Sequence, residues 1–277
     1  MFSLYGRFPP NRAAFVADCF HTLRELGLRY NTERTRGKFL LQAEPRGATT
    51  VVEAPEGLRA GAFEEAVDKV KRAHWPHIFM ALEVPREEAG GARRSVAEVP
   101  VTVSVRELPV SDSPAKYAGS PFFEVAIAIP FSALIDVERE EDAEQGMHWF
   151  VNQVFLPFLI SREALFGKAD FDPTGAREVA PRHLENLLIP DFYFLNALGV
   201  PFVKKYGVEP FLNPKINPVE LQKRWLMRTP EGALIFRAKT EADHWNGADE
   251  PTVDFHEWEG RFRILEKIEP KKKARPL

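Results

Sequence analysis

Residues 77–84 (HIFMALEV) form a nearly continuous apolar run within the first third of the chain. A short apolar run of this kind is typical of a strand that is covered on both faces. We therefore expect a central strand of a sheet over 77–84, and this strand decides how the segments before it are interpreted.

The segments before this strand alternate between strand and helix patterns. Residues 2–8 (FSLYGRF) alternate apolar and polar side chains, and a helical apolar stripe then runs from Asn11, a suitable N-cap, to Gly27. Two strands and a second amphipathic helix follow, over 30–41, 48–54 and 63–70. The order β-α-β-β-α-β predicts an α+β fold, with a ferredoxin-like half over residues 1–85.

A charged, Gly-rich stretch at 86–98 (REEAGGARRSVAE) is typical of a loop and marks the expected domain boundary. Beyond it, strand and helix patterns mix again without a parallel βαβ rhythm. We expect a second α+β half over residues 99–270, packed with the first half as one unit, and a basic tail over 271–277. Pro157 lies inside an apolar helical pattern and is expected to kink or split that helix.

The composition is that of a globular chain with nearly balanced charge. Of its 277 residues, 44% are hydrophobic, and 37 basic against 40 acidic residues give a net charge of −3. A nucleic-acid binder usually carries a basic excess, so this balance argues against that class. The single Cys19 excludes an internal disulfide, and its place on the apolar stripe of the first helix predicts a buried structural thiol.

Two apolar tracts raise the question of a membrane. Residues 148–160 and 187–203 are shorter than the roughly 18–20 residues of a membrane span and contain proline and polar side chains. We expect them to be buried helices of a protein without a membrane segment. The N-terminus shows no basic region followed by an apolar run, so a cytoplasmic location is expected.

The sequence contains none of the motifs that cradle phosphates, bind dinucleotides or present a nucleophilic serine. These motifs are G-x-x-x-x-G-K-[ST], G-x-G-x-x-G and G-x-S-x-G. No cofactor is therefore expected. His74 and His77 are three residues apart, but Pro76 lies between them and no H-E-x-x-H accompanies them, which favours structural roles over a metal site.

A stretch near the C-terminus carries residue types that suit a metal site: Asp243, His244, Asp249, Asp254, His256 and Glu257. Carboxylates and imidazoles ligate divalent ions and act as acid–base partners. A metal-dependent hydrolase with His244, Asp254 and His256 as ligands is therefore one alternative function. Because the spacing follows no established motif, a solvated acidic loop is the competing interpretation.

A second acidic stretch places five carboxylates within seven residues: Glu138, Glu140, Glu141, Asp142 and Glu144. Such a patch would attract a basic protein partner, so these residues are candidates for a partner-binding surface. The competing interpretation is a solvated helix start, where acidic residues suit the positive end of the helix dipole.

The stretch 187–212 (LLIPDFYFLNALGVPFVKKYGVEPFL), read as interrupted helix, precedes a hairpin pattern over 221–239. Together they resemble the C-terminal part of bacterial immunity proteins of type VI secretion and polymorphic-toxin systems. The features that carry the resemblance are Phe192, Tyr193, Phe194, Asn196, Gly199, Tyr206, Gly207 and Gly232. The resemblance implies a non-enzymatic cytoplasmic protein that binds and neutralises one cognate toxin, with no fixed set of functional residues.

The expected function is therefore that of a bacterial immunity protein, a binding protein whose partner is a cognate toxin or another basic protein. The alternatives are the metal-dependent hydrolase on the Asp243–Glu257 stretch and a structural or assembly protein.

Overall fold

The computed structural model describes residues 1–31, 38–42, 49–53, 61–73, 75–87, 94–108, 121–134, 144–170, 178–190, 193–212 and 219–237. The chain divides into two compact units, unit 1 from Met1 to Arg162 and unit 2 from Glu163 to Leu277. Both contain helices and antiparallel strands, so the α+β class is confirmed.

Two helices of unit 1 form where their apolar spacing predicts them. Helix α1 (Arg12–Glu25) begins at Asn11, whose side-chain oxygen accepts a hydrogen bond from the Ala14 N–H at 3.1 Å. Its apolar stripe, Cys19 included, is buried. Helix α2 (Ala62–Val70) buries Phe63 and Val70 on one side and carries Glu64 in its first turn, where the helix dipole favours a negative charge.

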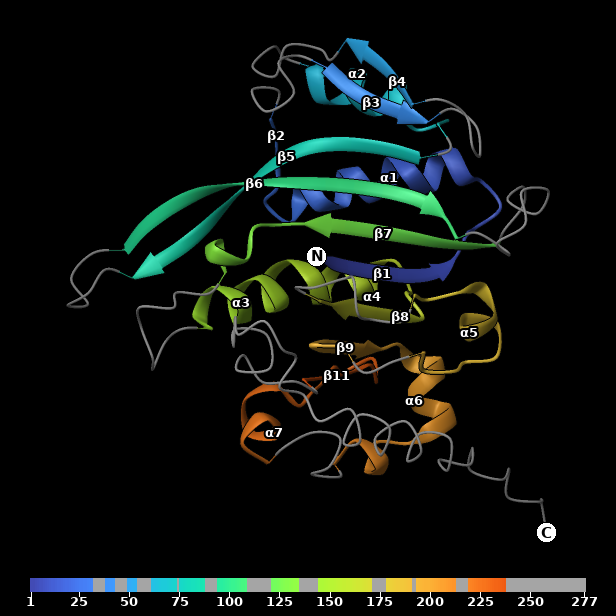
Figure 1. The fold of residues 1–277 in the computed structure, drawn as a ribbon, viewed down its shortest axis with the longest axis vertical. Helices are drawn as coiled ribbons and strands as arrows, with labels where there is room; N and C mark the ends of the chain where they lie inside the picture. The colour runs from blue at the N-terminus through green and yellow to red at the C-terminus, as the bar shows by residue number, and fades with distance from the viewer. Residues whose placement is uncertain are drawn as a thin grey trace, which may run out of the picture. The chain divides into compact units, whose positions relative to one another are not determined.

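The strands described in unit 1 form an antiparallel sheet (Figure 1). They are β1 (Phe2–Arg7), β2 (Arg29–Tyr30), β3 (Lys38–Gln42), β4 (Thr49–Glu53), β5 (Trp75–Glu87), β6 (Arg94–Glu107) and β7 (Phe122–Ala128). Their order is β1-β7-β6-β5-β3-β4, and the short β2 also pairs with β5. All these pairings are antiparallel. The central position expected for residues 77–84 is confirmed, because β5 has neighbours on both of its edges.

The strand order differs from that of the expected ferredoxin-like half. In that arrangement β1 would pair with strands of its own βαββαβ series. Here β1 pairs with β7, and β6 separates β7 from β5. The physical reason is that β6 occupies one edge of β5 over its length, from His77↔Ser104 to Glu87↔Arg94, while β2 and β3 occupy the other edge.

The pairing of β5 with β6 also places the boundary expected at 86–98 inside unit 1. Residues 86–87 and 94–98 of the expected loop lie in β5 and β6, which pair within one sheet, and unit 1 continues through β7 and the following helices to Arg162. The charged composition of the segment did not show that these positions pair as strands.

The core of unit 1 lies between one face of the sheet and the helices. Phe2 of β1 packs against Phe150 and Phe155, with ring centroids 4.6 and 5.2 Å apart. Phe123 of β7 lies on the same face and packs against Phe15 of α1 at 4.5 Å. Helix α1 and the helical segments that follow β7 therefore both cover this face.

The expected interruption at Pro157 is confirmed. Helix α3 (Gln145–Phe150) continues into a π-helical segment, η4 (Val151–Phe155), and then into α4 (Leu156–Ser161). Proline has no N–H and cannot donate the regular helical hydrogen bond, so the backbone changes its pattern in the preceding turn.

In unit 2, the strands within the described residues follow the order β10-β11-β9-β8. They are β8 (Phe166–Ala169), β9 (Leu195–Leu198), β10 (Met227–Arg228) and β11 (Leu234–Arg237). Its helices are α5 (Pro181–Glu185), α6 (Val200–Tyr206) and α7 (Val219–Trp225), with a 3₁₀ turn η5 (Glu209–Leu212). The interrupted helical tract expected in 187–203 thus contains strand β9, and most of the first expected hairpin strand is helix α7.

The residues that carried the family resemblance have structural roles in unit 2. Asn196 is fully buried, and its side chain accepts from the Tyr193 N–H at 3.0 Å and donates to the Tyr193 carbonyl at 2.7 Å. A Cβ at Gly199 would lie 2.2 Å from the Ala164 carbonyl oxygen, so only glycine allows this close approach. Gly232 has φ +97° in the β10–β11 turn, a conformation that favours glycine. Phe192 lies outside the described residues.

No helix in the described part of the chain is long and apolar enough to cross a membrane.

Candidate functional site

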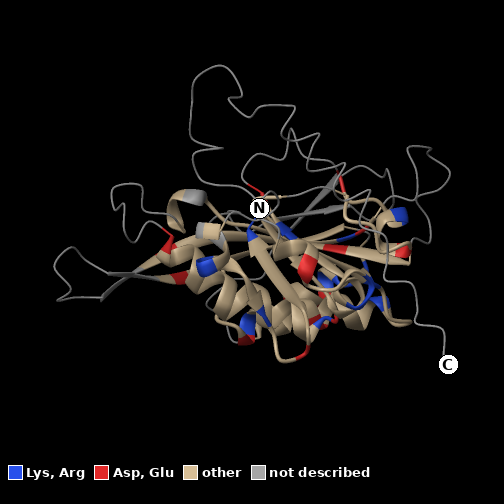
Figure 2. Cartoon of the chain, turned by 90° about the horizontal axis from the view of Figure 1, so that it is seen from below, with Lys and Arg blue, Asp and Glu red and all other residues tan. Residues whose placement is uncertain are grey.

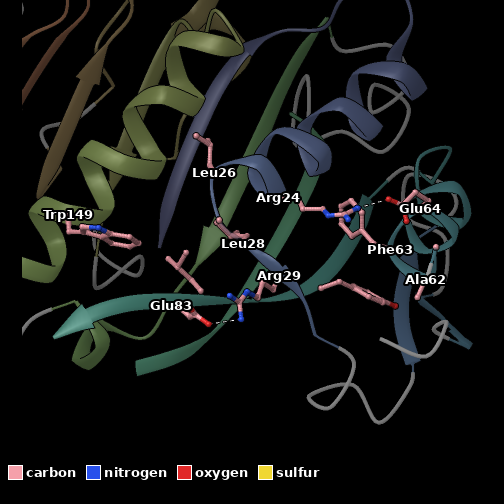
Figure 3. Close-up of a pocket in the computed structure, with 13 residues that line it drawn as sticks. Arg24, Leu26, Leu28, Arg29, Ala62, Phe63, Glu64, Glu83 and Trp149 are labelled. Carbon is pink, nitrogen blue, oxygen red and sulfur yellow. Dashed lines mark hydrogen bonds and ion pairs between the residues drawn. The ribbon is translucent and has the colours of Figure 1, made fainter. Parts of the chain in front are cut away.

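A groove in unit 1 is the strongest candidate for a binding site (Figure 3). We call it the Phe63 groove. It has a volume of about 660 Å³ and is lined by the end of α1, by β2, by the first turn of α2, and by residues of β5 and α3. This volume is in the range of sites that accept a small molecule or an inserted part of a partner.

The end of α1 shapes the middle of the groove. Gly27, at φ +102°, follows the helix, and its N–H bonds the Arg24 carbonyl at 3.0 Å. The Leu28 N–H bonds the Leu23 carbonyl at 3.0 Å, which completes a Schellman ending. Leu23 and Leu28 are both fully buried. This turn reverses the chain and lays Arg29 and Tyr30 along β5 as strand β2.

Phe63 forms the floor of one end of the groove. It is 5% exposed, and the Arg24 guanidinium lies over its ring, 4.8 Å from the centroid. Arg24 also pairs with Glu64 at 2.5 Å. The ring of Tyr30 contacts the ring of Phe63 with centroids 6.1 Å apart. This end therefore combines an aromatic floor with an exposed ion pair on its rim.

The pKa of the Tyr30 phenol is raised to about 12, first by burial and second by the nearby Glu65 carboxylate. Tyr30 therefore keeps its proton at neutral pH.

The other end of the groove lies between β5 and α3. Leu82 of β5 is buried in its floor, and Trp149 of α3 lines it. Glu83 of β5 pairs with Arg29 at 2.5 Å. The side chains of this pair are 44% and 68% exposed, so solvent screens the attraction and the pair separates at little cost.

A row of polar side chains crosses four strands on the sheet face opposite to Phe2 and Phe123. Tyr5 donates to Glu124 Oε1 at 2.8 Å, and Arg106 Nε donates to Glu124 Oε2. The Arg106 guanidinium lies 5.1 Å from the ring centroid of Trp75, whose ring contacts that of His77 at 4.9 Å. Burial, and secondarily the charge of Arg106, lowers the pKa of His77 to about 4. Each charge in the row has a partner, so the row fits a structural role.

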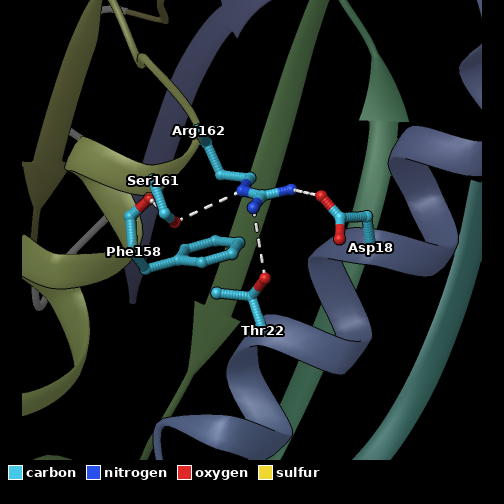
Figure 4. Close-up of polar contacts among 5 residues, drawn as sticks. All are labelled: Asp18, Thr22, Phe158, Ser161 and Arg162. Carbon is cyan, nitrogen blue, oxygen red and sulfur yellow. Dashed lines mark hydrogen bonds and ion pairs between the residues drawn. The ribbon is translucent and has the colours of Figure 1, made fainter.

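Another polar cluster joins the end of α4 to α1 (Figure 4). The Arg162 guanidinium pairs with Asp18 and donates to Thr22 Oγ1 at 3.2 Å and to Ser161 Oγ at 3.3 Å. Cys19, next to Asp18, is fully buried, which confirms the expected structural thiol. Burial raises the pKa of this thiol well above its usual range and keeps it protonated.

Most residues that the sequence singled out lie outside the described part of the chain: Glu138, Glu140, Glu141 and Asp142 of the acidic stretch, His74, and His244, Asp254 and His256 of the proposed metal site. Glu144 is described, and it precedes α3 as its N-cap residue. Its carbonyl accepts a hydrogen bond from the His148 N–H at 2.9 Å. Among the described residues, no group of three or more His, Cys, Asp or Glu could hold a metal ion.

The sequence did not reveal the Phe63 groove. Its lining comes from segments around residues 24–30, 61–64 and 82–83 and from Trp149. Only the helix ending at Gly27 and the amphipathic pattern of α2 were visible as local signals, and neither indicates a groove. Over the described elements, acidic and basic residues are interspersed (Figure 2), so charge alone does not mark the site either.

In comparisons with known proteins, no family model, no curated protein and no solved structure matches this chain.

Proposed function

We propose that this chain is a cytoplasmic binding protein that neutralises a cognate toxin, as immunity proteins do, and that the partner binds at the Phe63 groove. The observation that supports the proposal is the make-up of the groove. It combines an apolar floor, half-buried aromatic walls and two arginines within one concave surface.

Tryptophan, tyrosine and arginine are enriched at the energetic centres of protein interfaces. Tyr30 and Trp149 each expose part of a large ring, which supplies contact area at low cost in conformational entropy. The ion pairs Arg24–Glu64 and Arg29–Glu83 lie on the rim with exposed side chains. They separate readily and can pair again with charges of a partner.

Glu144, the last residue of the acidic stretch, directly precedes the helix that carries Trp149. Glu144 is followed by helix α3, and Trp149 is five residues further along. At a rise of about 1.5 Å per residue, the helix places the two residues about 7.5 Å apart along its axis. Carboxylates close to the groove would speed the approach of a basic toxin.

The experiment that tests the proposal is co-expression with the toxin encoded beside the gene for this chain. We expect the intact chain to restore growth and to form a stoichiometric complex with the toxin. Trp149→Ala combined with Tyr30→Ala should abolish protection. A matched control, Leu212→Ala, truncates a side chain that is 42% exposed in unit 2 and should protect fully.

Reversal of Glu140, Glu141 and Asp142 to lysine tests the acidic stretch separately. We expect slower association with the toxin, because the reversal changes the charge that attracts a basic partner. Unchanged association would remove these residues from the interface. Full protection by the groove variant would reject the groove as the binding site, and failure of the intact chain to bind or protect would reject the proposed function.

A further inference from the structure

One edge of strand β5 is open where it borders the Phe63 groove. The Asn31 N–H bonds the Phe79 carbonyl at 3.1 Å, so the backbone groups of Phe79 point away from β6 and toward the side of β2. The register between β5 and β6 is continuous over the whole of β5, and backbone groups alternate in direction along a strand. The N–H and C=O of Glu83 therefore also point toward the side of β2.

Strand β2 does not extend far enough to cover these backbone groups of Glu83. It pairs with Met80 and Ala81 of β5 and stops short of Glu83. Gly27, just before β2, directs its N–H to the Arg24 carbonyl instead. In the described part of the chain, no backbone hydrogen bond engages the N–H or C=O of Glu83, a residue that lines the groove. An open strand edge of this kind is a template for pairing with another chain.

The two sides of this edge differ in their side chains. On the side of the helices, Leu26 and Trp149 are half-buried and line the groove (Figure 3). On the opposite side, Glu83 lies directly across from Glu98, and Arg29 pairs with Glu83. A strand added along this edge would direct alternate side chains toward the helices and place the residue opposite Glu83 on the acidic side. A basic residue is favoured at that position, because opposite charges on facing strands attract.

We propose that this open edge of β5 binds an extended segment of the partner as an added strand, with backbone hydrogen bonds to Glu83 and an apolar–basic–apolar order of side chains. Pro85 is the next residue of β5 whose backbone points outward, and proline has no N–H. A second copy of β5 would contribute a proline from each strand, so a short segment of another protein fits this edge better. The identity of the partner rests on the proposed function, whereas the binding of a strand at this edge does not.

The first test needs no toxin. The probe, acetyl-Thr-Val-Lys-Val-Thr-amide, is titrated into the full-length protein at constant ionic strength, and the amide resonance of Gly27 is followed by NMR. With lysine opposite Glu83, the lysine N–H would bond the Glu83 carbonyl, and the N–H groups of both valines would point away. We expect saturable binding that is about tenfold weaker when the lysine amide is N-methylated, and unchanged when the first valine amide is N-methylated. A probe with glutamate in place of lysine should also bind more weakly.

Two variants separate the backbone of Glu83 from its side chain. Glu83→Ala removes the carboxylate and retains the N–H, while Glu83→Pro removes both, and proline is tolerated at outward positions of edge strands. We expect Glu83→Pro to bind the probe about five- to tenfold more weakly than Glu83→Ala, as for loss of one backbone hydrogen bond. Urea unfolding checks that both variants fold. If Glu83→Pro does not, the two methylated probes make the same comparison on the intact chain.

The outcomes separate the two proposals. Absence of binding, or equal binding of the two methylated probes, overturns the added strand. A free protein that is dimeric, with its Glu83 amide protected from hydrogen exchange, overturns it in favour of a second copy. If the chain neutralises the toxin while the Glu83 amide still exchanges freely in the complex, the proposed function stands without the added strand. If the probe binds as expected and the chain neither binds nor neutralises the toxin, the strand site stands and the proposed function falls.

Discussion

His77 should make the stability of unit 1 depend on pH in a predictable range. Its pKa in the folded protein is about 4, and in an unfolded chain a histidine has a pKa of about 6.5. Above about pH 6.5 both states hold neutral imidazole, so His77 has no effect on the pH dependence. Between about pH 6.5 and 4 only the unfolded chain takes up the proton, and the free energy of unfolding falls as pH falls.

The size of this effect follows from the two pKa values. One pKa step corresponds to about 1.4 kcal/mol, so acidification from about pH 7.5 to about pH 4.5 should lower the free energy of unfolding by about 3 kcal/mol through His77. Two factors oppose protonation of His77: burial of the ring, which contacts Trp75, and the positive charge of Arg106.

Urea unfolding at several pH values in this range measures the effect, with His77→Phe as the comparison. Phenylalanine retains an aromatic ring that packs against Trp75 and cannot titrate. Because other groups titrate alike in both proteins, the difference between the two curves isolates His77. We expect the variant to lose less stability on acidification, by about 3 kcal/mol. Parallel curves would refute the reasoning, since they would mean that the folded protein protonates His77 as easily as the unfolded chain does.

Other expectations concern single buried contacts. Glu124→Ala leaves Arg106 and the Tyr5 hydroxyl without their shared acceptor and should lower the free energy of unfolding by about 2–3 kcal/mol, measured by urea titration, while Glu25→Ala should change it little. Cys19 should react with a thiol reagent only at the rate of unfolding, and rapid labelling of the native protein would contradict its burial. Gly199→Ala should cost about 1–3 kcal/mol, because the new Cβ meets the Ala164 carbonyl, and an unchanged melting temperature would contradict that close approach.

Local signals predicted the elements of this fold better than their arrangement. Asn11 and Gly27 mark the two ends of α1 because caps act through hydrogen bonds within one turn, and the structure shows both. The apolar run at 77–84 predicts a central strand for an equally local reason. The partner of β1 could not be predicted in this way, because the choice between β5 and β7 depends on which edges other strands already occupy.

Errors in unit 2 have a similar origin. Residues 195–198 (LNAL) are apolar except for Asn196 and lie in a tract that contains proline and aromatic residues. A short, mostly apolar run suits a buried helix or a buried strand equally well. Pairing with β8 and β11 decides in favour of the strand. The candidate site depends even more on distant segments, because its lining joins the end of α1, the start of α2, β5 and Trp149 of α3.

Buried and exposed charges of this sheet differ in how they are paired. In the row across the sheet, the buried Glu124 has two hydrogen-bond donors, as a buried charge requires. On the same sheet face, Glu83 is directly opposite Glu98, and the Arg29 guanidinium that pairs with Glu83 is 68% exposed. Such an arrangement gives no stability to the free chain, since like charges on opposite strands repel. The exposed Arg29–Glu83 pair therefore contributes little to stability, whereas the buried Glu124 and its two donors help to hold the strands together.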